Sequence, residues 1–294
     1  MNSILIQDLE KQKLKFYLLL VLWPLYLIFL PYVVLKLGFI SVLFMIFPGL
    51  YLFTWLGFLM HETWHKYVKS IPNDLLFNIY SWMLFSDPQF YKRVHGYHHS
   101  KIHTWEDVEF HPLGKIENAH LRKIYNLMEL ALGIVFINLI IYTRFSKIGI
   151  LKDTISRKKM LSSIALIAIF IMAVSMISHY TLNVPASTIF WAYIINLWLS
   201  SFFLHHSQLV EHGNIIVDGT FDERNIWTRN MSPSGILEKI FLFLTHGDSR
   251  EHVLHHTLPS VYSRPFPGTL PMPEGSVYIS IKDYLRIVAE MIIK

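Results

Sequence analysis

Four long stretches of the chain contain no Asp, Glu, Lys or Arg, and each is long enough to cross a bilayer as a helix. They cover residues 16–35, 39–60, 161–180 and 186–204. The connection within each pair is very short, around 36–38 and 181–185, and Pro185 is a helix breaker at the second one. The pattern therefore predicts two hairpins of membrane-spanning helices.

Two shorter apolar stretches lie between these hairpins. Residues 130–143 have a length more typical of a re-entrant or interfacial helix than of a spanning one, and residues 70–85 are expected to lie on the membrane or dip into it. A crossing at 130–143 would place the histidines near residue 100 and those beyond residue 204 on opposite sides of the membrane. We therefore expect four spans.

The regions 61–126 and 205–294 then form one cytoplasmic helical cap, and the whole chain, 1–294, is expected to be a single all-α domain. Of the 26 Lys and Arg residues, Lys36 alone falls at a tip on the other side. This distribution agrees with a cytoplasmic location for both termini and for the basic run from Arg144 through Lys147 and Lys152 to Lys159. Because the tips are so short, the placement of the histidines supports this topology more strongly.

Composition supports a membrane protein, since 53% of the 294 residues are hydrophobic and only 16% are charged. The first apolar stretch is too long for a signal peptide and has no small-residue cleavage site after it, so we expect it to remain. A net charge of +5 in such a chain reflects basic residues kept on the cytoplasmic side and does not indicate nucleic-acid binding. The absence of cysteine excludes disulfides, thiolate-bound zinc and iron–sulfur clusters.

The chain has 16 histidines, and most of them are clustered. The clusters are His61-Glu-Thr-Trp-His65, His95-Gly-Tyr-His98-His99, His205-His206, Gln208-Leu-Val-Glu-His212 and His252-Val-Leu-His255-His256. On a helix, such spacings direct two or three imidazoles from one face. Isolated histidines such as His120 and His179 are better explained as interfacial, but burying several clusters without a ligand has no structural benefit.

About nine imidazoles exceed the needs of one four- to six-coordinate ion, so two metal ions are implied. Nitrogen ligands without thiolates suit iron, copper or zinc. The clusters lie at or beyond the cytoplasmic ends of the predicted hairpins. We therefore expect them to meet at the inner surface of the membrane.

The motifs resemble the three histidine boxes of the membrane fatty acid desaturase and hydroxylase superfamily, over roughly residues 60–265. Three segments look most like the alkane monooxygenase branch and related fatty-acid-oxidising enzymes: His61-Glu-Thr-Trp-His65-Lys66, Val210-Glu211-His212-Gly213 and His252-Val-Leu-His255-His256. The second box, His95-Gly-Tyr-His98-His99, departs from that branch. Two residues separate its first histidine from the histidine pair, where alkane monooxygenases have three.

The resemblance implies two non-haem irons with nine histidine ligands. These are His61, His65, His95, His98, His99, His212, His252, His255 and His256. Gln208 stands where relatives carry an amide that can hold a water on the metal. The additional histidines, His103, His205, His206 and His246, are expected to support the ligands or the fold, although His205 or His206 could replace a ligand.

Several carboxylates near the boxes could accept the outer ring N–H of a ligating histidine, or could be solvated surface charges. They are Glu62, Glu106, Asp107, Glu109, Glu211, Asp248 and Glu251. An alkyl or acyl substrate is expected to enter from the bilayer along aromatic side chains, which could equally face lipid or pack in the core. These are Trp55, Phe58, Trp191, Trp198 and Phe202.

The predicted function is an O2-dependent attack on an unactivated C–H bond of a fatty acid, fatty acyl or alkyl chain, by desaturation or hydroxylation. Oxidative decarboxylation of a fatty acid to a terminal alkene is an alternative, because these outcomes differ by small changes in substrate placement. Electrons must come from a separate ferredoxin, rubredoxin or cytochrome-type donor, since no cysteine-bound centre or flavin motif is present.

Two other classes compete with this interpretation. The segment His61-Glu62-Thr-Trp-His65 also reads as the H-E-x-x-H motif of a zinc protease, with Glu62 as the general base. That interpretation leaves the two H-x-x-H-H clusters unexplained. A metal transporter would require more polar residues inside the spans than the scattered Ser, Thr, Asn and His179 found there.

Overall fold

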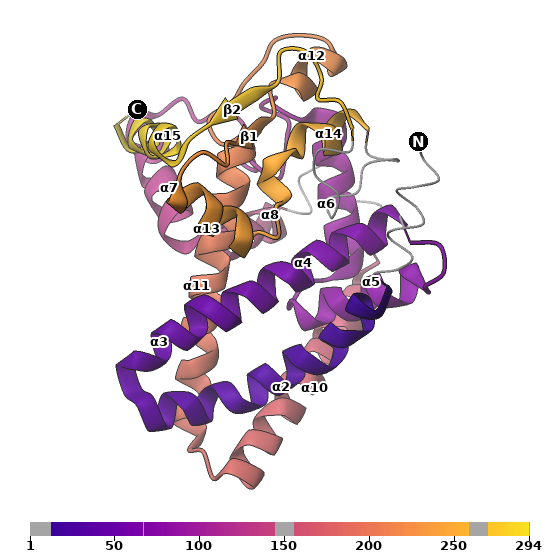
Figure 1. The fold of residues 1–294 in the computed structure, drawn as a ribbon, viewed down its shortest axis with the longest axis vertical. Helices are drawn as coiled ribbons and strands as arrows, with labels where there is room; N and C mark the ends of the chain where they lie inside the picture. The colour runs from indigo at the N-terminus through magenta and orange to yellow at the C-terminus, as the bar shows by residue number, and fades with distance from the viewer. Residues whose placement is uncertain (1–12, 67, 145–155, 259–269, 294) are drawn as a thin grey trace. The chain divides into compact units, whose positions relative to one another are not determined.

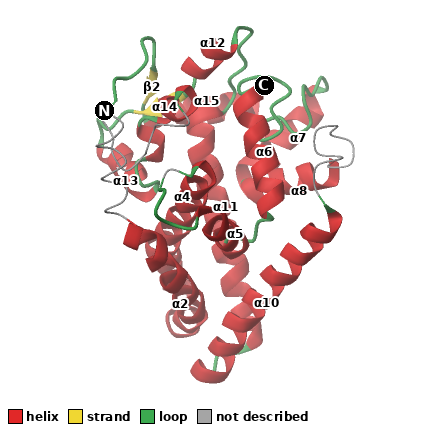
Figure 2. Cartoon of the chain, turned by 90° about the vertical axis from the view of Figure 1, so that its right-hand side faces the viewer, coloured by secondary structure: helices red, strands yellow, loops and turns green. Residues whose placement is uncertain are grey.

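The structure is a computed structural model that describes residues 13–66, 68–144, 156–258 and 270–293, and these are mostly helical (Figures 1 and 2). Lys147, Lys152 and the two termini, for which the sequence predicts a cytoplasmic location, lie outside the described residues. The chain divides into two compact units. The first unit comprises Met1–Tyr91 and Ile155–Ser200, and the second comprises Lys92–Thr154 and Ser201–Lys294.

The first unit begins with a helical hairpin. Its elements are α2 (Lys13–Leu37), the short turn η1 (Gly38–Ile40), α3 (Ser41–Phe44), the π-turn η2 (Met45–Gly49) and α4 (Leu50–His65). The chain reverses at Gly38, whose φ of 54° is unfavourable for a residue with a side chain. Aromatic contacts join the two arms, with the ring centroids of Trp23 and Phe53 5.8 Å apart and those of Tyr26 and Phe44 5.5 Å apart.

The two pairs of rings show that α2 runs antiparallel to the arm formed by α3 and α4, as the two N-terminal apolar stretches predict. Gly49 allows the close approach, because a Cβ at this position would collide with the hydroxyl of Tyr26. That hydroxyl donates a hydrogen bond to Asn196 Oδ1 at 2.6 Å, which ties the hairpin to α11.

The second predicted hairpin consists of α10 (Arg157–Leu182) and α11 (Ala186–His212). Asn183, in the left-handed conformation, ends α10, and Pro185 precedes α11, which confirms the predicted break at 181–185. The last helix extends beyond the predicted apolar stretch, because α11 continues without interruption from residue 204 to His212.

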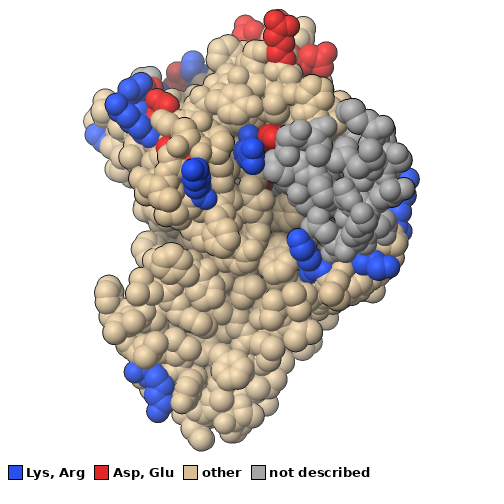
Figure 3. Space-filling model, in the orientation of Figure 1, with Lys and Arg blue, Asp and Glu red and all other residues tan. Residues whose placement is uncertain are grey.

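Three helical segments are long and apolar enough to cross a membrane: Lys13–His65, which contains both N-terminal stretches, Arg157–Leu182 and Ala186–His212. Figure 3 shows few charged side chains over the visible helices of the first unit, as expected for surfaces that face lipid. The stretch predicted at 70–85 contains α5 (Asn73–Met83), which packs against α4. Trp23 Nε1 donates a hydrogen bond to Met83 O at 3.1 Å and fixes the end of α5 against α2.

The apolar stretch 130–143 does not form one continuous helix. The structure has α7 (Ala119–Leu132) and α8 (Ile134–Arg144), separated by Gly133 with a φ of 62°. A Cβ at Gly133 would overlap the backbone of Ser201. The Ser201 hydroxyl completes the break by donating to Leu132 O at 2.8 Å and accepting from Val135 N at 2.9 Å. At 11 residues, α8 is shorter than a spanning helix.

Helix α6 (Pro88–Lys101) leads from the first unit into the second. The remaining elements of the second unit are α12 (Phe221–Ile226), β1 (Arg229–Met231), α13 (Ile236–Leu244), η3 (Asp248–Arg250), α14 (His252–Thr257), β2 (Val277–Ile279) and α15 (Ile281–Ile293). The parallel pair of β1 and β2, with Asn230 opposite Tyr278, was not predicted. The hydrophobic core of the second unit includes Leu209, Val210 and Met231, which are almost fully buried.

Candidate metal centre

Helix α14 carries three of the predicted ligands, His252, His255 and His256, and all three are buried. This helix has only six residues and is held in place by the side chain of Asn230 on β1. Asn230 Oδ1 accepts from Val253 N at 3.1 Å, and its Nδ2 donates to Val277 O at 3.0 Å. The small sheet therefore positions the first turn of α14.

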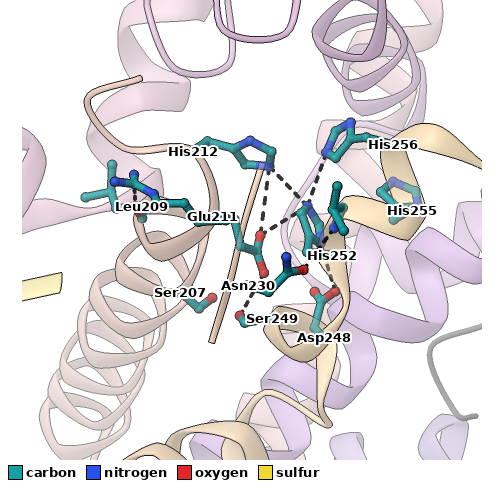
Figure 4. A network of polar contacts seen from close by, with 12 residues as sticks. Ser207, Leu209, Glu211, His212, Asn230, Asp248, Ser249, His252, His255 and His256 are labelled. Carbon is teal, nitrogen blue, oxygen red and sulfur yellow. Dashed lines mark hydrogen bonds and ion pairs between the residues drawn. The ribbon is translucent and has the colours of Figure 1, made fainter. Parts of the chain in front are cut away.

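A first group of histidines in the second unit surrounds His252 (Figure 4). His252 Nε2 lies 3.0 Å from His212 Nε2, 3.2 Å from His256 Nε2 and 3.2 Å from Glu211 Oε2. The ring nitrogens of His98, His212 and His256 are also within 4.8 Å of one another. These side chains come from α6, α11 and α14, which are distant in sequence.

Hydrogen bonds alone do not account for this arrangement. One ring nitrogen carries either one proton or one lone pair, so His252 Nε2 can hydrogen-bond with one of its three neighbours at most. Nitrogens about 3 Å apart are spaced as adjacent ligands of one ion are when each metal–nitrogen bond is about 2.1 Å. The donor set therefore fits a metal ion.

A second group lies beside the first. His99 Nε2 is 3.2 Å from His95 Nε2 and 3.0 Å from His255 Nε2. The rings of His99 and His256 have centroids 4.8 Å apart, so this group adjoins the first. The second unit therefore brings together seven of the nine predicted ligands, in two neighbouring sets.

The other two predicted ligands, His61 and His65, lie in the first unit on the last turn of α4. Their Nε2 atoms are 3.2 Å apart, so the two rings point toward the same position, as the spacing of four residues predicts. Glu62 Oε1 lies 3.3 Å from His61 Nδ1. The helix ends immediately afterwards at Lys66, which adopts the left-handed conformation.

Carboxylates hold the outer ring nitrogens of the second box. His98 Nδ1 lies 2.8 Å from Asp107 Oδ2, and His95 Nδ1 lies 3.2 Å from Glu109 Oε2. Burial disfavours a charged ring at His98, but the charges of Asp107 and Glu109 and the hydrogen bond to Asp107 outweigh it and raise the pKa of His98. Burial likewise opposes ionisation of Glu109, yet His95 and His98 lower its pKa to about 2. Both rings therefore have a fixed orientation with Nε2 directed inward.

The third box has a similar partner in Asp248, whose Oδ1 lies 3.3 Å from His252 Nδ1. Glu211 was expected to accept from the outer nitrogen of a ligating ring, but it lies beside the inner nitrogen of His252. Its Oε1 accepts from the Ser249 hydroxyl at 2.7 Å, and this contact directs Oε2 toward the inner nitrogen of His252 (Figure 4). Glu211 thus belongs to the donor set itself by geometry.

His103 contacts the outer ring nitrogen of His212. Its Nδ1 donates to Arg224 O at 2.8 Å, and its Nε2 lies 3.2 Å from His212 Nδ1. Burial lowers the pKa of His103 to about 3, so its ring is neutral and Nε2 is an acceptor. His212 Nδ1 must then carry the proton, and His212 Nε2 keeps its lone pair.

Burial, followed by the neighbouring rings of His99 and His212, lowers the pKa of His256 well below its usual value. A neutral imidazole is the form that binds metals. This histidine therefore presents a lone pair at ordinary pH.

The remaining histidines of α11 have other partners. His205 Nε2 lies 3.0 Å from Glu129 Oε1, and both side chains are buried. His206 contacts the Tyr284 hydroxyl and donates to Leu130 O at 3.0 Å. Sequence reasoning missed Glu129. Its signal was a single carboxylate at the edge of an apolar stretch, where a charge is costly without a partner.

Three further residues were predicted to lie near the histidines. Gln208 is half-buried on α11, His246 has a φ of 54° in the turn after α13, and Glu251 is buried immediately before α14. Among the aromatic residues proposed for a substrate path, Trp191, Trp198 and Phe202 are exposed, Trp55 is half-buried and Phe58 is buried.

Long apolar helices together with buried groups of histidines that could hold metal ions define a histidine-rich membrane protein. The sequence profile of the fatty acid desaturase family matches residues 37–267. The chain therefore belongs to the fatty acid desaturase family, whose members are oxidoreductases acting on lipid substrates. Searches of curated proteins and of solved structures found no match.

Proposed function

We propose that this protein is an O2-dependent diiron oxidoreductase that attacks an unactivated C–H bond of a fatty acid, fatty acyl or alkyl chain, by desaturation or hydroxylation. The observation that carries the proposal is the convergence of His212 Nε2, His256 Nε2 and Glu211 Oε2 on His252 Nε2. Family membership supports a lipid substrate and an oxidative reaction. The histidine boxes favour the alkane monooxygenase-like branch.

The proposed ligands of one iron come from His98, His212, His252 and His256, with Glu211 beside them. Those of the other come from His95, His99 and His255, and the family's first box adds His61 and His65. Imidazole and carboxylate donors without thiolate suit non-haem iron. Two bound ferrous ions would bind and reduce dioxygen and so supply the oxidising power for breaking the C–H bond.

The chain's own groups orient and shield this chemistry. Asp107, Glu109 and Asp248 accept from outer ring nitrogens, which stops the ligating rings from rotating. His103 does the same for His212 without adding charge. Because most of these side chains are buried, bulk water has little access to the inner nitrogens.

The proposed topology has four spans. Both arms of Lys13–His65 would cross the membrane, as would α10 and α11, and the termini and metal ligands would lie on the cytoplasmic side in one domain. An acyl or alkyl chain could then reach the site from the bilayer. Electrons would come from a separate ferredoxin, rubredoxin or cytochrome-type protein, because the chain has no cysteine with which to bind an iron–sulfur centre.

Two other functions receive less support. Decarboxylation to a terminal alkene would use the same groups with a different placement of the substrate. A zinc protease would use Glu62 as a base, but the Glu62 carboxylate lies 3.3 Å from His61 Nδ1, a position that suits holding this ring.

Metal analysis of the purified protein tests the proposal, together with product analysis in cells that are fed labelled fatty acids and alkanes. We expect two irons per chain and oxidised chain products. His252→Ala should lose iron, whereas His120→Ala, at an exposed position on α7, should keep it. A single zinc per chain, or unchanged iron in His252→Ala, would contradict the proposed centre.

A further inference from the structure

Helix α13 exposes large apolar side chains along one face. Ile236, Leu237, Ile240 and Phe243 are 72%, 60%, 46% and 64% exposed. Their spacing of one, three and three residues places them on a single side of the helix. A row of this kind is unfavourable in water and indicates a contact with an apolar partner.

The opposite side of α13 is packed into the second unit. Phe241 and Leu242 are buried in its core, and the ring of Phe241 lies 5.7 Å from that of Phe203 on α11. Helix α11 is one of the segments long and apolar enough to cross a membrane. The exposed row therefore belongs to a helix fastened to the side of such a segment.

The charges of α13 are arranged to suit a lipid surface. Its acidic residue, Glu238, is turned inward, where Oε1 accepts from Ile281 N at 3.0 Å at the start of α15. Lys239 is exposed beside the apolar row. The outer face thus has an amino group for phosphate headgroups and no carboxylate, since Glu238 is the helix's single acidic residue.

We propose that α13 lies in the plane of the membrane, with Ile236, Leu237, Ile240 and Phe243 inserted at the boundary between headgroups and acyl chains. Nine residues span about 14 Å at about 1.5 Å per residue, well short of a bilayer of about 30 Å, so the helix lies on the membrane instead of crossing it. This inference does not depend on the reaction proposed above.

The contact has a consequence for the histidines. Helix α13 ends at Leu244, and Asp248, the partner of His252, follows after one turn. Insertion of α13 therefore sets the depth at which α14 is held relative to the lipid. A chain entering from the bilayer would meet the third histidine box at a defined height.

Because the natural chain has no cysteine, single cysteines can carry a nitroxide label at chosen positions. We would label Ile240→Cys and Phe243→Cys in the full-length protein, reconstituted in vesicles of phosphatidylcholine and phosphatidylglycerol. Leu242→Cys, on the buried side of the same helix, and Asp222→Cys, exposed on α12, are the controls. Each variant should first match the wild-type elution profile in gel filtration.

Electron paramagnetic resonance then compares collisions with oxygen, which concentrates in hydrocarbon, and with a water-soluble nickel chelate. We expect oxygen collisions to exceed chelate collisions several-fold at positions 240 and 243, and the reverse at position 222. Chelate collisions at 240 and 243 equal to those at 222 would place the face in water. Low values for both reagents, as at 242, would mean that protein covers it. Either result would overturn the proposal, whatever the iron content.

Discussion

His103 Nε2 lies 3.2 Å from His212 Nδ1, and this contact determines which nitrogen of His212 is available for a metal. His103 is itself held by Arg224 O, so the backbone of α12 is linked through two imidazoles to the candidate centre. The contact between these two rings is not evident from the spacing of the histidine boxes.

Replacing His103 with Ala removes the acceptor for His212 Nδ1–H, and the His212 ring can then rotate or change tautomer. We expect the affinity for iron to fall by about 10- to 100-fold, as for the loss of other groups that orient ligands. Iron retention during titration with a chelator measures this effect. Substitution of exposed His120 is the control, and wild-type retention in His103→Ala would show that the contact does not orient the ligand.

Asp107→Asn should weaken the second box. The amide keeps the side chain's shape but removes the negative charge that helps raise the pKa of His98 and makes its Nε2 a stronger donor. We expect a loss of about 10-fold or more in iron affinity, with little change in thermal unfolding. Glu106→Gln, at an exposed carboxylate nearby, provides the comparison and should leave iron binding unchanged.

Gly133→Ala should destabilise the protein by more than about 1 kcal/mol, because the residue has a φ of 62° and the added Cβ would overlap the Ser201 backbone. Thermal unfolding in detergent measures the change. The matched control is Gly57→Ala in α4, where a Cβ meets nothing within 4 Å and should be neutral or slightly stabilising. Equal midpoints for the two variants would contradict the role given to Gly133.

Glu62→Gln distinguishes the proposed diiron oxidoreductase from a zinc protease. The amide oxygen can still accept from His61 Nδ1–H, so we expect the protein still to bind iron and to oxidise lipid, with a loss of iron affinity no greater than that of Asp107→Asn. A protease that relied on Glu62 as its base would lose all activity while still binding zinc. Complete loss of the protein's activity with one zinc retained per chain would therefore favour the protease.

Asn230→Ala removes two hydrogen bonds, the one that Oδ1 accepts from Val253 N and the one that Nδ2 donates to Val277 O. We expect the free energy of unfolding to fall by about 1–3 kcal/mol and iron retention to decrease, because α14 loses its link to the strand pair. Thermal unfolding and chelator titration measure the two effects. If stability falls but iron retention does not, the strand pair does not position the histidines of α14.

Local chemistry allowed much of this protein to be predicted from its sequence. Runs without charge identified the helices of both hairpins, and Pro185 identified the break between α10 and α11. The spacings of His61 with His65, and of His252 with His255 and His256, indicated shared faces and hence metal binding. These features depend on residues close in the chain, so helical periodicity is sufficient to reveal them.

Contacts between distant residues could not be predicted in this way. The break at Gly133 depends on Ser201, the pairing of β1 with β2 joins segments separated by α13 and α14, and Glu129 meets His205 only after folding. The inward direction of Glu211 depends on Ser249. The sequence by itself determined which segments are apolar helices and which residues can bind metal. The tertiary structure decided which nitrogen or oxygen each residue presents, because that choice is made by partners far away in the chain.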